Sequence, residues 1–295
     1  MQPISEQLNG KRIIRVFVTK TNATPIDPLV VINKSPGLFD EADEVHISVL
    51  FTWDINRAEV LAKQWQSVAS VKLGGPALNS YGEEFEPGMY VKKGYVITSR
   101  GCPNKCWFCS VWKREGHQVR ELEVKEGYNI LDDNLLACSE SHIIKVFDML
   151  RRQKEPAEFS GGLEAKRLKS WHVELLKSIR FHQIWFAYDT DDDLEPLAEA
   201  GKLLREHGIG ITKAGSVSHK VRCYCLIGYP RDTFDAADRR LKTAYSNGFL
   251  PMAMLYRNGS DPEKDWKKFQ KYWARPASIN RMCRDNTKVY RVGET

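Results

Sequence analysis

The chain has 295 residues with an ordinary hydrophobic fraction of 42% and a modest net charge of +6. This composition excludes a disordered or low-complexity protein and predicts a globular one, with one large domain plus an appendage or with two domains. The chain has no secretory signal at its start and no run long enough to cross a bilayer, so we expect no membrane association and a cytoplasmic location. Seven cysteines in a reducing compartment favour metal or cofactor binding over disulfides.

Residues 1–92 predict a small N-terminal α/β domain. Runs of β-branched residues bounded by Pro, Asn, Asp or Gly predict strands at residues 12–18, 29–32, 45–51 and 71–77. A helix is expected over residues 56–69, with Asp54 as its N-cap. The apolar face of this helix is expected to comprise Val60, Leu61, Trp65 and Val68. A Gly-, Glu- and Pro-containing linker follows at residues 79–87.

Residues 93–256 show a regular alternation of strand and helix patterns. Strands are expected at residues 95–99, 128–131, 157–160, 183–188, 222–228 and 252–256. Apolar stripes at helical spacing lie between most of them, and Thr233, Gly208 and Gly248 stand where helix caps belong. Successive strand–helix–strand units predict a mainly parallel sheet with right-handed crossovers. If such a sheet curls into a barrel, functional residues gather at the carboxyl ends of its strands.

Residues 257–295 form a basic, aromatic C-terminal extension. Basic residues interleave with aromatic ones, which indicates nucleic-acid binding through charge and stacking; an amphipathic helix with packed aromatics and solvated lysines explains the same pattern. The basic residues are Lys264, Lys267, Lys268, Lys271, Arg275, Arg281, Arg284, Lys288 and Arg291. The aromatic residues are Trp266, Phe269, Tyr272 and Trp273.

A C-x-x-x-C-x-x-C motif follows the first strand of the second block. Its three cysteines, Cys102, Cys106 and Cys109, lie within eight residues, and Gly101 and Pro103 favour the turn that such a loop needs. Three thiolate ligands for a four-iron cluster leave one iron open to a small molecule, whereas a fully ligated cluster only transfers electrons. The alternative is a zinc site with His117 as fourth ligand, although structural zinc sites usually contain paired short spacings.

With Phe108 directly before the third cysteine, the motif resembles that of the radical S-adenosylmethionine (radical SAM) superfamily. The similarity extends over residues 93–256 in the order of strands and helices. The resemblance implies a partial, six-unit parallel α/β barrel and a 4Fe-4S cluster on Cys102, Cys106 and Cys109. It also implies S-adenosylmethionine as cofactor, cleavage to a 5′-deoxyadenosyl radical, and a reductant such as flavodoxin or ferredoxin.

The resemblance also suggests cofactor-binding residues at the strand ends. Phe108 is expected near the adenine, and Gly228 where the fifth strand backs it. Asp133 is expected to accept the methionine ammonium, with Asp132 on the opposite strand face, where the family usually has a Gly-Gly-Glu-like segment. The remaining candidates at strand ends are Asn134, Ser160, Gly161, Gly162 and Glu164. Each of these is equally compatible with an ordinary turn after a strand.

Four further cysteines lie outside the motif. Cys223 and Cys225 alternate along one strand and therefore face the same side, while Cys138 follows the second strand and Cys283 lies in the extension. None of the four has cluster-like spacing, so we expect buried thiols rather than an auxiliary cluster.

The segments Met252-Ala-Met-Leu-Tyr-Arg257 and Trp273-Ala-Arg-Pro276 resemble radical enzymes carried by bacteriophages and prophages. This resemblance implies rearrangement (isomerisation) or modification of a nucleobase in DNA hypermodification, so DNA or a modified nucleotide is the expected substrate. The alternatives are a peptide or small metabolite as substrate, and a non-catalytic iron–sulfur DNA-binding module. Asp189, Tyr256 and Arg257 are the catalytic candidates, although the acidic run after residue 188 also suits a helix cap.

Overall fold

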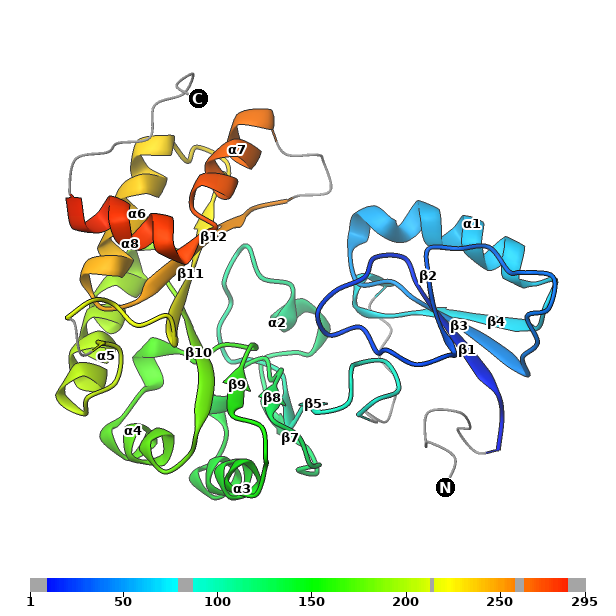
Figure 1. The fold of residues 1–295 in the computed structure, drawn as a ribbon, viewed down its shortest axis with the longest axis horizontal. Coiled ribbons are helices and arrows are strands. Elements are labelled where there is room, and N and C mark those ends of the chain that lie inside the picture. The colour runs from blue at the N-terminus through cyan, green and yellow to red at the C-terminus, as the bar shows by residue number, and fades with distance from the viewer. Residues whose placement is uncertain (1–9, 79–86, 213–214, 258–262, 286–295) are drawn as a thin grey trace. The chain divides into compact units, whose positions relative to one another are not determined.

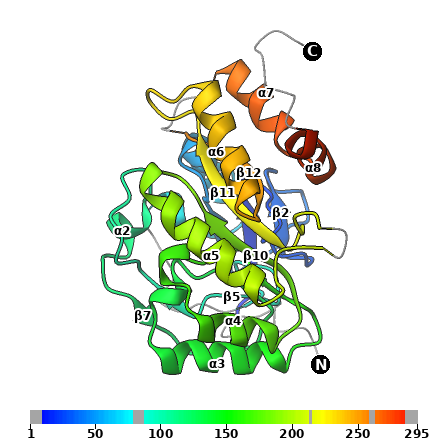
Figure 2. The ribbon, with the colours of Figure 1, turned by 90° about the vertical axis from the view of Figure 1, so that its left-hand side faces the viewer.

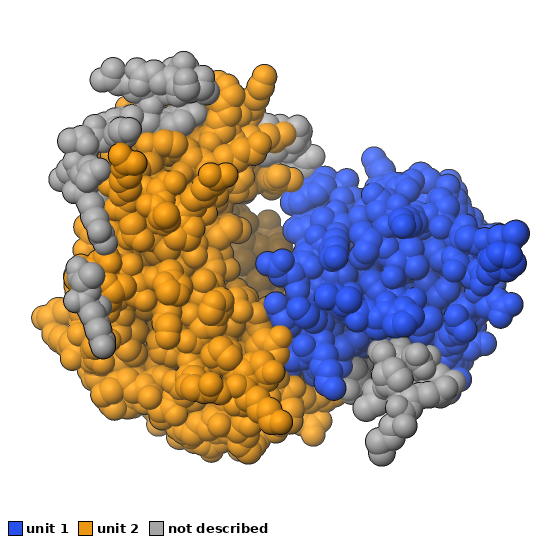
Figure 3. Space-filling model, viewed as in Figure 1, with its two compact units in different colours: residues 1–96 blue, residues 97–295 orange. Residues whose placement is uncertain are grey.

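The computed structural model describes residues 10–78, 87–212, 215–257 and 263–285. Within them the chain divides into two compact units, residues 1–96 and residues 97–295, which are coloured separately in Figure 3. The second unit includes the segment after residue 256. Most of the expected linker, residues 79–86, lies outside the described residues, as do Lys288, Arg291 and the side chain of Arg284.

The first unit contains a parallel four-stranded sheet in the order β2-β1-β3-β4 (Figure 1). Its strands are β1 (Ile13–Phe17), β2 (Val30–Ile32), β3 (Glu44–Ser48) and β4 (Ser70–Gly74). The helical segments are η2 (Thr52–Asp54), α1 (Ile55–Trp65) and η3 (Pro76–Leu78). All five residues of β1 are buried, as expected for an apolar strand in the middle of a parallel sheet. The four predicted strands are confirmed.

Two expectations for α1 need correction. Asp54 occupies the N-cap position, as predicted, but its carboxylate accepts a hydrogen bond from Thr19 Oγ1 (2.7 Å) and makes no capping bond to the helix. Val60 is 46% exposed, whereas Leu61 and Trp65 are fully buried. Successive helical residues point about 100° apart, so the face that buries Ala58, Leu61 and Trp65 turns Val60 to solvent.

The main sheet has the order β12-β11-β10-β9-β8-β5, with β5 and β12 at its two edges. Pairing is parallel from β12 through to β8. The fold is therefore α/β with parallel sheets, as predicted. The strands are β5 (Tyr95–Val96), β8 (Asn129–Ile130), β9 (Ala157–Phe159), β10 (Phe181–Ala187), β11 (Val221–Ile227) and β12 (Leu250–Leu255). A separate antiparallel pair consists of β6 (Ser99–Arg100) and β7 (Arg120–Glu121).

The helices that connect the strands from β8 to β12 lie along one side of this sheet (Figures 1 and 2). Every strand from β9 to β12 pairs with its predecessor, an order that places successive right-handed crossovers on the same face. The α-helices of this region are α2 (Val111–Arg114), α3 (Glu140–Arg151), α4 (Ser170–Lys177), α5 (Leu194–Glu206) and α6 (Phe234–Ser246). Short 3-10 turns are η4 (Leu135–Ala137), η5 (Ala165–Arg167) and η6 (Asp191–Asp193). The Thr233 side chain caps α6 as predicted.

The single strand expected at residues 95–99 is wrong, because the chain forms β5 and β6 with a break between them. Thr98 lies at the break, and its N–H donates to Asp132 Oδ1 (2.6 Å) while its carbonyl accepts from Leu122 N (2.8 Å). Both backbone groups of Thr98 are thereby bonded outside the main sheet, which ends β5 at Val96.

The extension forms α7 (Lys264–Tyr272) and α8 (Pro276–Asp285), whose apolar faces pack onto the unit. Phe269, Trp273 and Ile279 are fully buried. Trp273 is therefore unavailable for base stacking, and the packed-aromatic explanation of the pattern holds for Phe269 and Trp273. None of the helices in the described ranges combines the length and apolar character needed to span a bilayer.

Candidate functional site

The cysteine motif lies in a loop closed at its base by the β6–β7 pair. Gly101 opens the loop with φ +90°, and a Cβ there would lie only 2.3 Å from Gln118 O, so the two ends of the loop approach too closely for a side chain. Cys109 N donates to Cys106 O (3.1 Å), and Val111 N at the start of α2 donates to Cys109 Sγ (3.4 Å). The fold therefore turns the three cysteines back into one short loop.

The three motif thiols interact electrostatically. Burial, followed by the charges of Cys109 and Cys102, raises the pKa of Cys106 to about 11, and burial also raises the pKa of Cys109. All three cysteines are free and partly buried. Within the described ranges, no three His, Cys, Asp or Glu side chains stand close enough together to hold a metal ion.

The donor set nevertheless fits an iron–sulfur cluster in its chemistry. Three sulfur donors share one tight loop, and a metal that replaces their protons would lower the cost of burying the thiolates. The side chain of His117, the alternative zinc ligand, stacks on Trp112 with ring centroids 5.6 Å apart.

The three polar residues after β8 point to different partners. Asp132 is 1% exposed and accepts from Thr98 N, Thr98 Oγ1 and Ser99 Oγ at 2.6–2.7 Å. Burial raises its pKa. The Asp132 side chain therefore points into the interior, as strand alternation predicts. Its two oxygens already accept hydrogen bonds from Thr98 and Ser99, so they are not available to a ligand. Asp133 is partly exposed, and its Oδ2 accepts from Gly101 N at the base of the cysteine loop (2.9 Å).

Asn134 links the cysteine loop to the loop after β9. Its Nδ2 donates to Cys102 Sγ (3.3 Å) and to Glu164 Oε2 (2.7 Å). Its Oδ1 is buried and has no hydrogen-bond partner among the described residues. Glu164 Oε2 also accepts from Arg167 Nε (2.5 Å), so this carboxylate is held in place from two sides. An unpartnered amide oxygen beside Cys102 is a polar group suited to a ligand with a donor.

The Ser160-Gly-Gly segment is packed against the end of β8. A Cβ on Gly161 would lie 2.2 Å from Asp132 O, so only glycine allows this approach. Gly162 has φ +90°. Ser160 Oγ donates to Glu158 Oε1 (3.2 Å). The two glycines thus serve to bring the ends of β8 and β9 together, which positions Glu164 next to Asn134.

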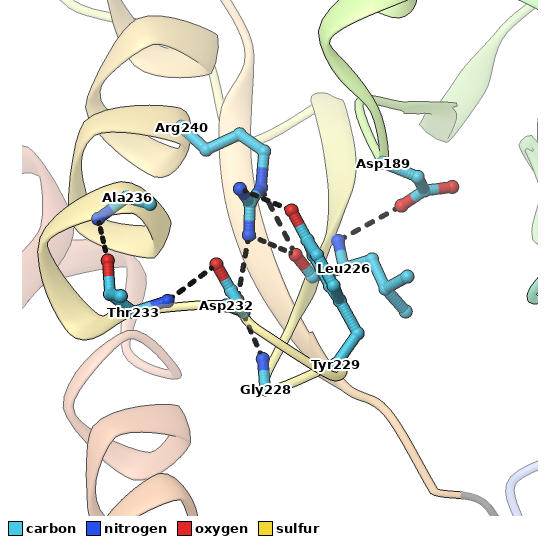
Figure 4. Close-up of polar contacts among 8 residues, drawn as sticks. All are labelled: Asp189, Leu226, Gly228, Tyr229, Asp232, Thr233, Ala236 and Arg240. Carbon is cyan, nitrogen blue, oxygen red and sulfur yellow. Dashed lines mark hydrogen bonds and ion pairs between the residues drawn. The ribbon is translucent and has the colours of Figure 1, made fainter.

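Asp189 follows β10 and is mostly buried. Burial, and then the neighbouring Asp193, raises the pKa of Asp189 to about 7, so this carboxyl exchanges a proton near neutral pH. One oxygen accepts from Leu226 N (3.0 Å), as Figure 4 shows. The charges of Asp189 and Asp193 also contribute to the raised pKa of Cys106. The carboxylates at the end of β10 therefore act electrostatically on the cysteine loop.

A buried ion pair supports the end of β11. Arg240 Nη2 donates to Asp232 Oδ2 (2.9 Å) and to Leu226 O (2.8 Å), and Arg240 Nη1 donates to Tyr229 OH (3.1 Å; Figure 4). Asp232 Oδ2 in turn accepts from Gly228 N (2.8 Å). A Cβ on Gly228 would clash with Leu255 and with the Trp266 ring, so the groups that approach Gly228 closely are these two protein side chains.

Aromatic rings connect the cysteine loop to the ends of β11 and β12. Trp107 is 50% exposed, and its ring lies 5.3 Å from Phe108, 5.6 Å from Tyr229 and 5.5 Å from Tyr256, centroid to centroid. Tyr256 is thereby placed beside the loop, while Arg257 follows it as an exposed residue. Sequence reasoning missed Trp107 and Tyr229; the position of Trp107 inside the cysteine motif is the signal that was available.

The remaining cysteines are free thiols in the structure. Cys223 and Cys225 are fully buried with their sulfurs 4.0 Å apart, which confirms that they face the same side of β11. Cys138 and Cys283 are partly buried, and burial raises the pKa of each to about 11.

A comparison with protein-family models finds none that matches the chain, and a comparison with curated proteins finds no match either.

Proposed function

We propose that the chain is a radical SAM enzyme that holds a 4Fe-4S cluster on Cys102, Cys106 and Cys109 and binds S-adenosylmethionine beside it. The observation that carries the proposal is the Asn134 side chain, which contacts both Cys102 Sγ and the Glu164 carboxylate. It joins the cysteine loop and the carboxyl ends of two neighbouring parallel strands, the edge where parallel α/β folds bind ligands.

When bound, such a cluster would supply the electron that cleaves the sulfonium of S-adenosylmethionine to a 5′-deoxyadenosyl radical. The chain's own residues would bind and orient the cofactor. Asp133 and Glu164 provide carboxylates for the methionine ammonium, and the Asn134 amide oxygen remains for a further donor. The rings of Trp107 and Tyr256 offer apolar faces beside the loop.

For the substrate we propose a nucleobase in DNA or a modified nucleotide, which the enzyme rearranges or modifies. Support comes from a hollow of about 560 Å³ at α7 and α8, which is lined by Lys271, Arg275 and Arg281. Three cations around one hollow can contact several phosphates of a nucleic-acid strand. Lys268, on the same helix, pairs with Asp265 (3.2 Å). Asp189, with its proton exchange near neutral pH, is the candidate acid or base toward the substrate.

Asp133→Ala is expected to weaken S-adenosylmethionine binding about tenfold or more, since a charge-assisted hydrogen bond is worth roughly 1.5–3 kcal/mol. Isothermal titration of the anaerobic, reconstituted protein measures the effect. Asp148→Ala, which removes an exposed carboxylate from α3, serves as the control and should bind as wild type does. If Asp133→Ala binds S-adenosylmethionine with wild-type affinity and Glu164→Gln binds it more weakly, the contact with the methionine ammonium would be assigned to Glu164 instead.

DNA affinity is expected to fall steeply with salt, and replacing Lys271, Arg275 and Arg281 by glutamine should reduce the log–log slope by about 2–3, at roughly 0.7–0.9 per lost phosphate contact. Fluorescence anisotropy with single- and double-stranded DNA across a salt series measures the slope. Glutamine at the exposed Lys145, Lys177 and Lys202, none of which lines the hollow, is the matched control. Salt-insensitive or absent binding would favour a peptide or a small metabolite as substrate.

A further inference from the structure

A second hollow, of about 300 Å³, lies between the segments that lead into α3 and α4. One wall comes from η4 and the start of α3, the other from η5 and the start of α4; these two helices lie side by side in Figures 1 and 2. Its volume is at the lower end of the range for small-molecule sites. None of the residues assigned above to the cluster or to S-adenosylmethionine lines it.

His172 in the wall of this hollow carries an unpartnered hydrogen-bond donor. The side chain is 3% exposed, and its Nδ1 accepts from Lys169 N (3.0 Å). Burial lowers the pKa of His172 to about 4, so the ring is neutral at pH 7, and its proton is on Nε2 because Nδ1 is an acceptor. Nε2 is buried without a partner among the described residues. A buried N–H with no acceptor is costly, and a ligand oxygen would remove that cost.

The same hollow is lined by Lys166, Arg167 and Lys169, with Glu140 as the opposing charge. Arg167 is paired with Glu164. Lys166 and Lys169 are exposed and form no ion pair in the part of the chain that the structure describes. Two unneutralised ammonium groups around a neutral imidazole N–H favour an anion with several acceptor oxygens.

The rest of the lining is apolar. Leu136 and Ile143 are buried residues of one wall, and the Trp171 ring in the other wall lies 3.8 Å from the His172 ring, centroid to centroid. We propose that this hollow is a binding site for a small molecule that presents one oxyanion group, phosphate or carboxylate, to His172, Lys166 and Lys169, and an apolar part to Trp171, Leu136 and Ile143.

The test uses the full chain, isotopically labelled with ¹⁵N and kept under reducing conditions, and it needs neither a cluster nor S-adenosylmethionine. Inorganic phosphate, sulfate or acetate is titrated in at constant ionic strength, and the imidazole nitrogens are followed by long-range ¹H–¹⁵N NMR correlation. At least one of the three anions should shift the His172 Nε2–H signal saturably, while Nδ1 remains unprotonated. Phosphate and sulfate compared with acetate distinguish a tetrahedral oxyanion from a carboxylate.

Glutamine at both Lys166 and Lys169 should weaken binding of that anion about tenfold or more, because two charge-assisted contacts are lost. Both side chains are exposed, so the double variant is expected to fold. Glutamine at Lys145 and Lys177, exposed residues of α3 and α4 that do not line the hollow, should leave the affinity unchanged within about twofold. No saturable shift with any of the three anions, or equal affinity in the two double variants, would overturn the proposal.

Discussion

Protein in which Cys102, Cys106 and Cys109 are all replaced by alanine is expected to retain no cluster iron and no brown absorbance after anaerobic reconstitution. Thiolates are the ligands of the proposed cluster, and the β6–β7 loop contains no other cysteine, so the loss should be complete rather than partial. Iron content by mass spectrometry and the visible spectrum measure it.

The control for this variant is the replacement of cysteines outside the loop. Cys138→Ala with Cys283→Ala removes two partly buried thiols and should leave the iron content at the wild-type level. Iron retained by the triple variant would contradict the assignment. Stoichiometric zinc without iron in freshly purified anaerobic wild-type protein would contradict it as well, and would revive the zinc alternative.

Asp132→Ala is expected to destabilise the second unit by about 3 kcal/mol or more, because three buried donors on Thr98 and Ser99 lose their acceptor. The free energy of unfolding from urea denaturation measures the effect. Asp132→Asn should cost less, since its amide oxygen still accepts from Thr98 N and its NH₂ donates to a hydroxyl oxygen.

Asp133→Ala is the matched control, because Asp133 is partly exposed and accepts one hydrogen bond, from Gly101 N. Asp132→Ala should therefore lower the free energy of unfolding, whereas Asp133→Ala should lower the affinity for S-adenosylmethionine. Equal stability of Asp132→Ala and wild type would show that the Thr98 and Ser99 contacts do not hold the start of the cysteine loop.

Periodicity was sufficient to predict most of the second unit. The strands from β8 to β12 lie in short, largely apolar runs that alternate with helical patterns, and Thr233, Gly208 and Gly248 mark helix ends in the sequence. The break between β5 and β6 could not be predicted this way, because it depends on a hydrogen bond from Thr98 to Asp132, 34 residues along the chain. Only the folded chain brings the two together.

The candidate site was predictable in part for the same reason. Alternation along a strand places Asp132 and Asp133 on opposite faces. It does not predict that the Asp132 carboxylate accepts hydrogen bonds from Thr98 and Ser99. Charge and aromatic content likewise could not separate stacking rings from packed ones, and Trp273 is fully buried. The link from Asn134 to Cys102 and Glu164 depends on the glycine turn at residues 160–162, whose role is steric.

The central claim is tested most directly by incubating the anaerobically reconstituted protein with S-adenosylmethionine and a strong reductant, and measuring 5′-deoxyadenosine and methionine by chromatography. The proposal predicts that both products form together in equal amounts with the wild-type chain, and that neither forms with the variant lacking Cys102, Cys106 and Cys109. A wild-type protein that binds iron but forms no 5′-deoxyadenosine above that variant, with DNA, nucleotides or peptides present, would contradict it.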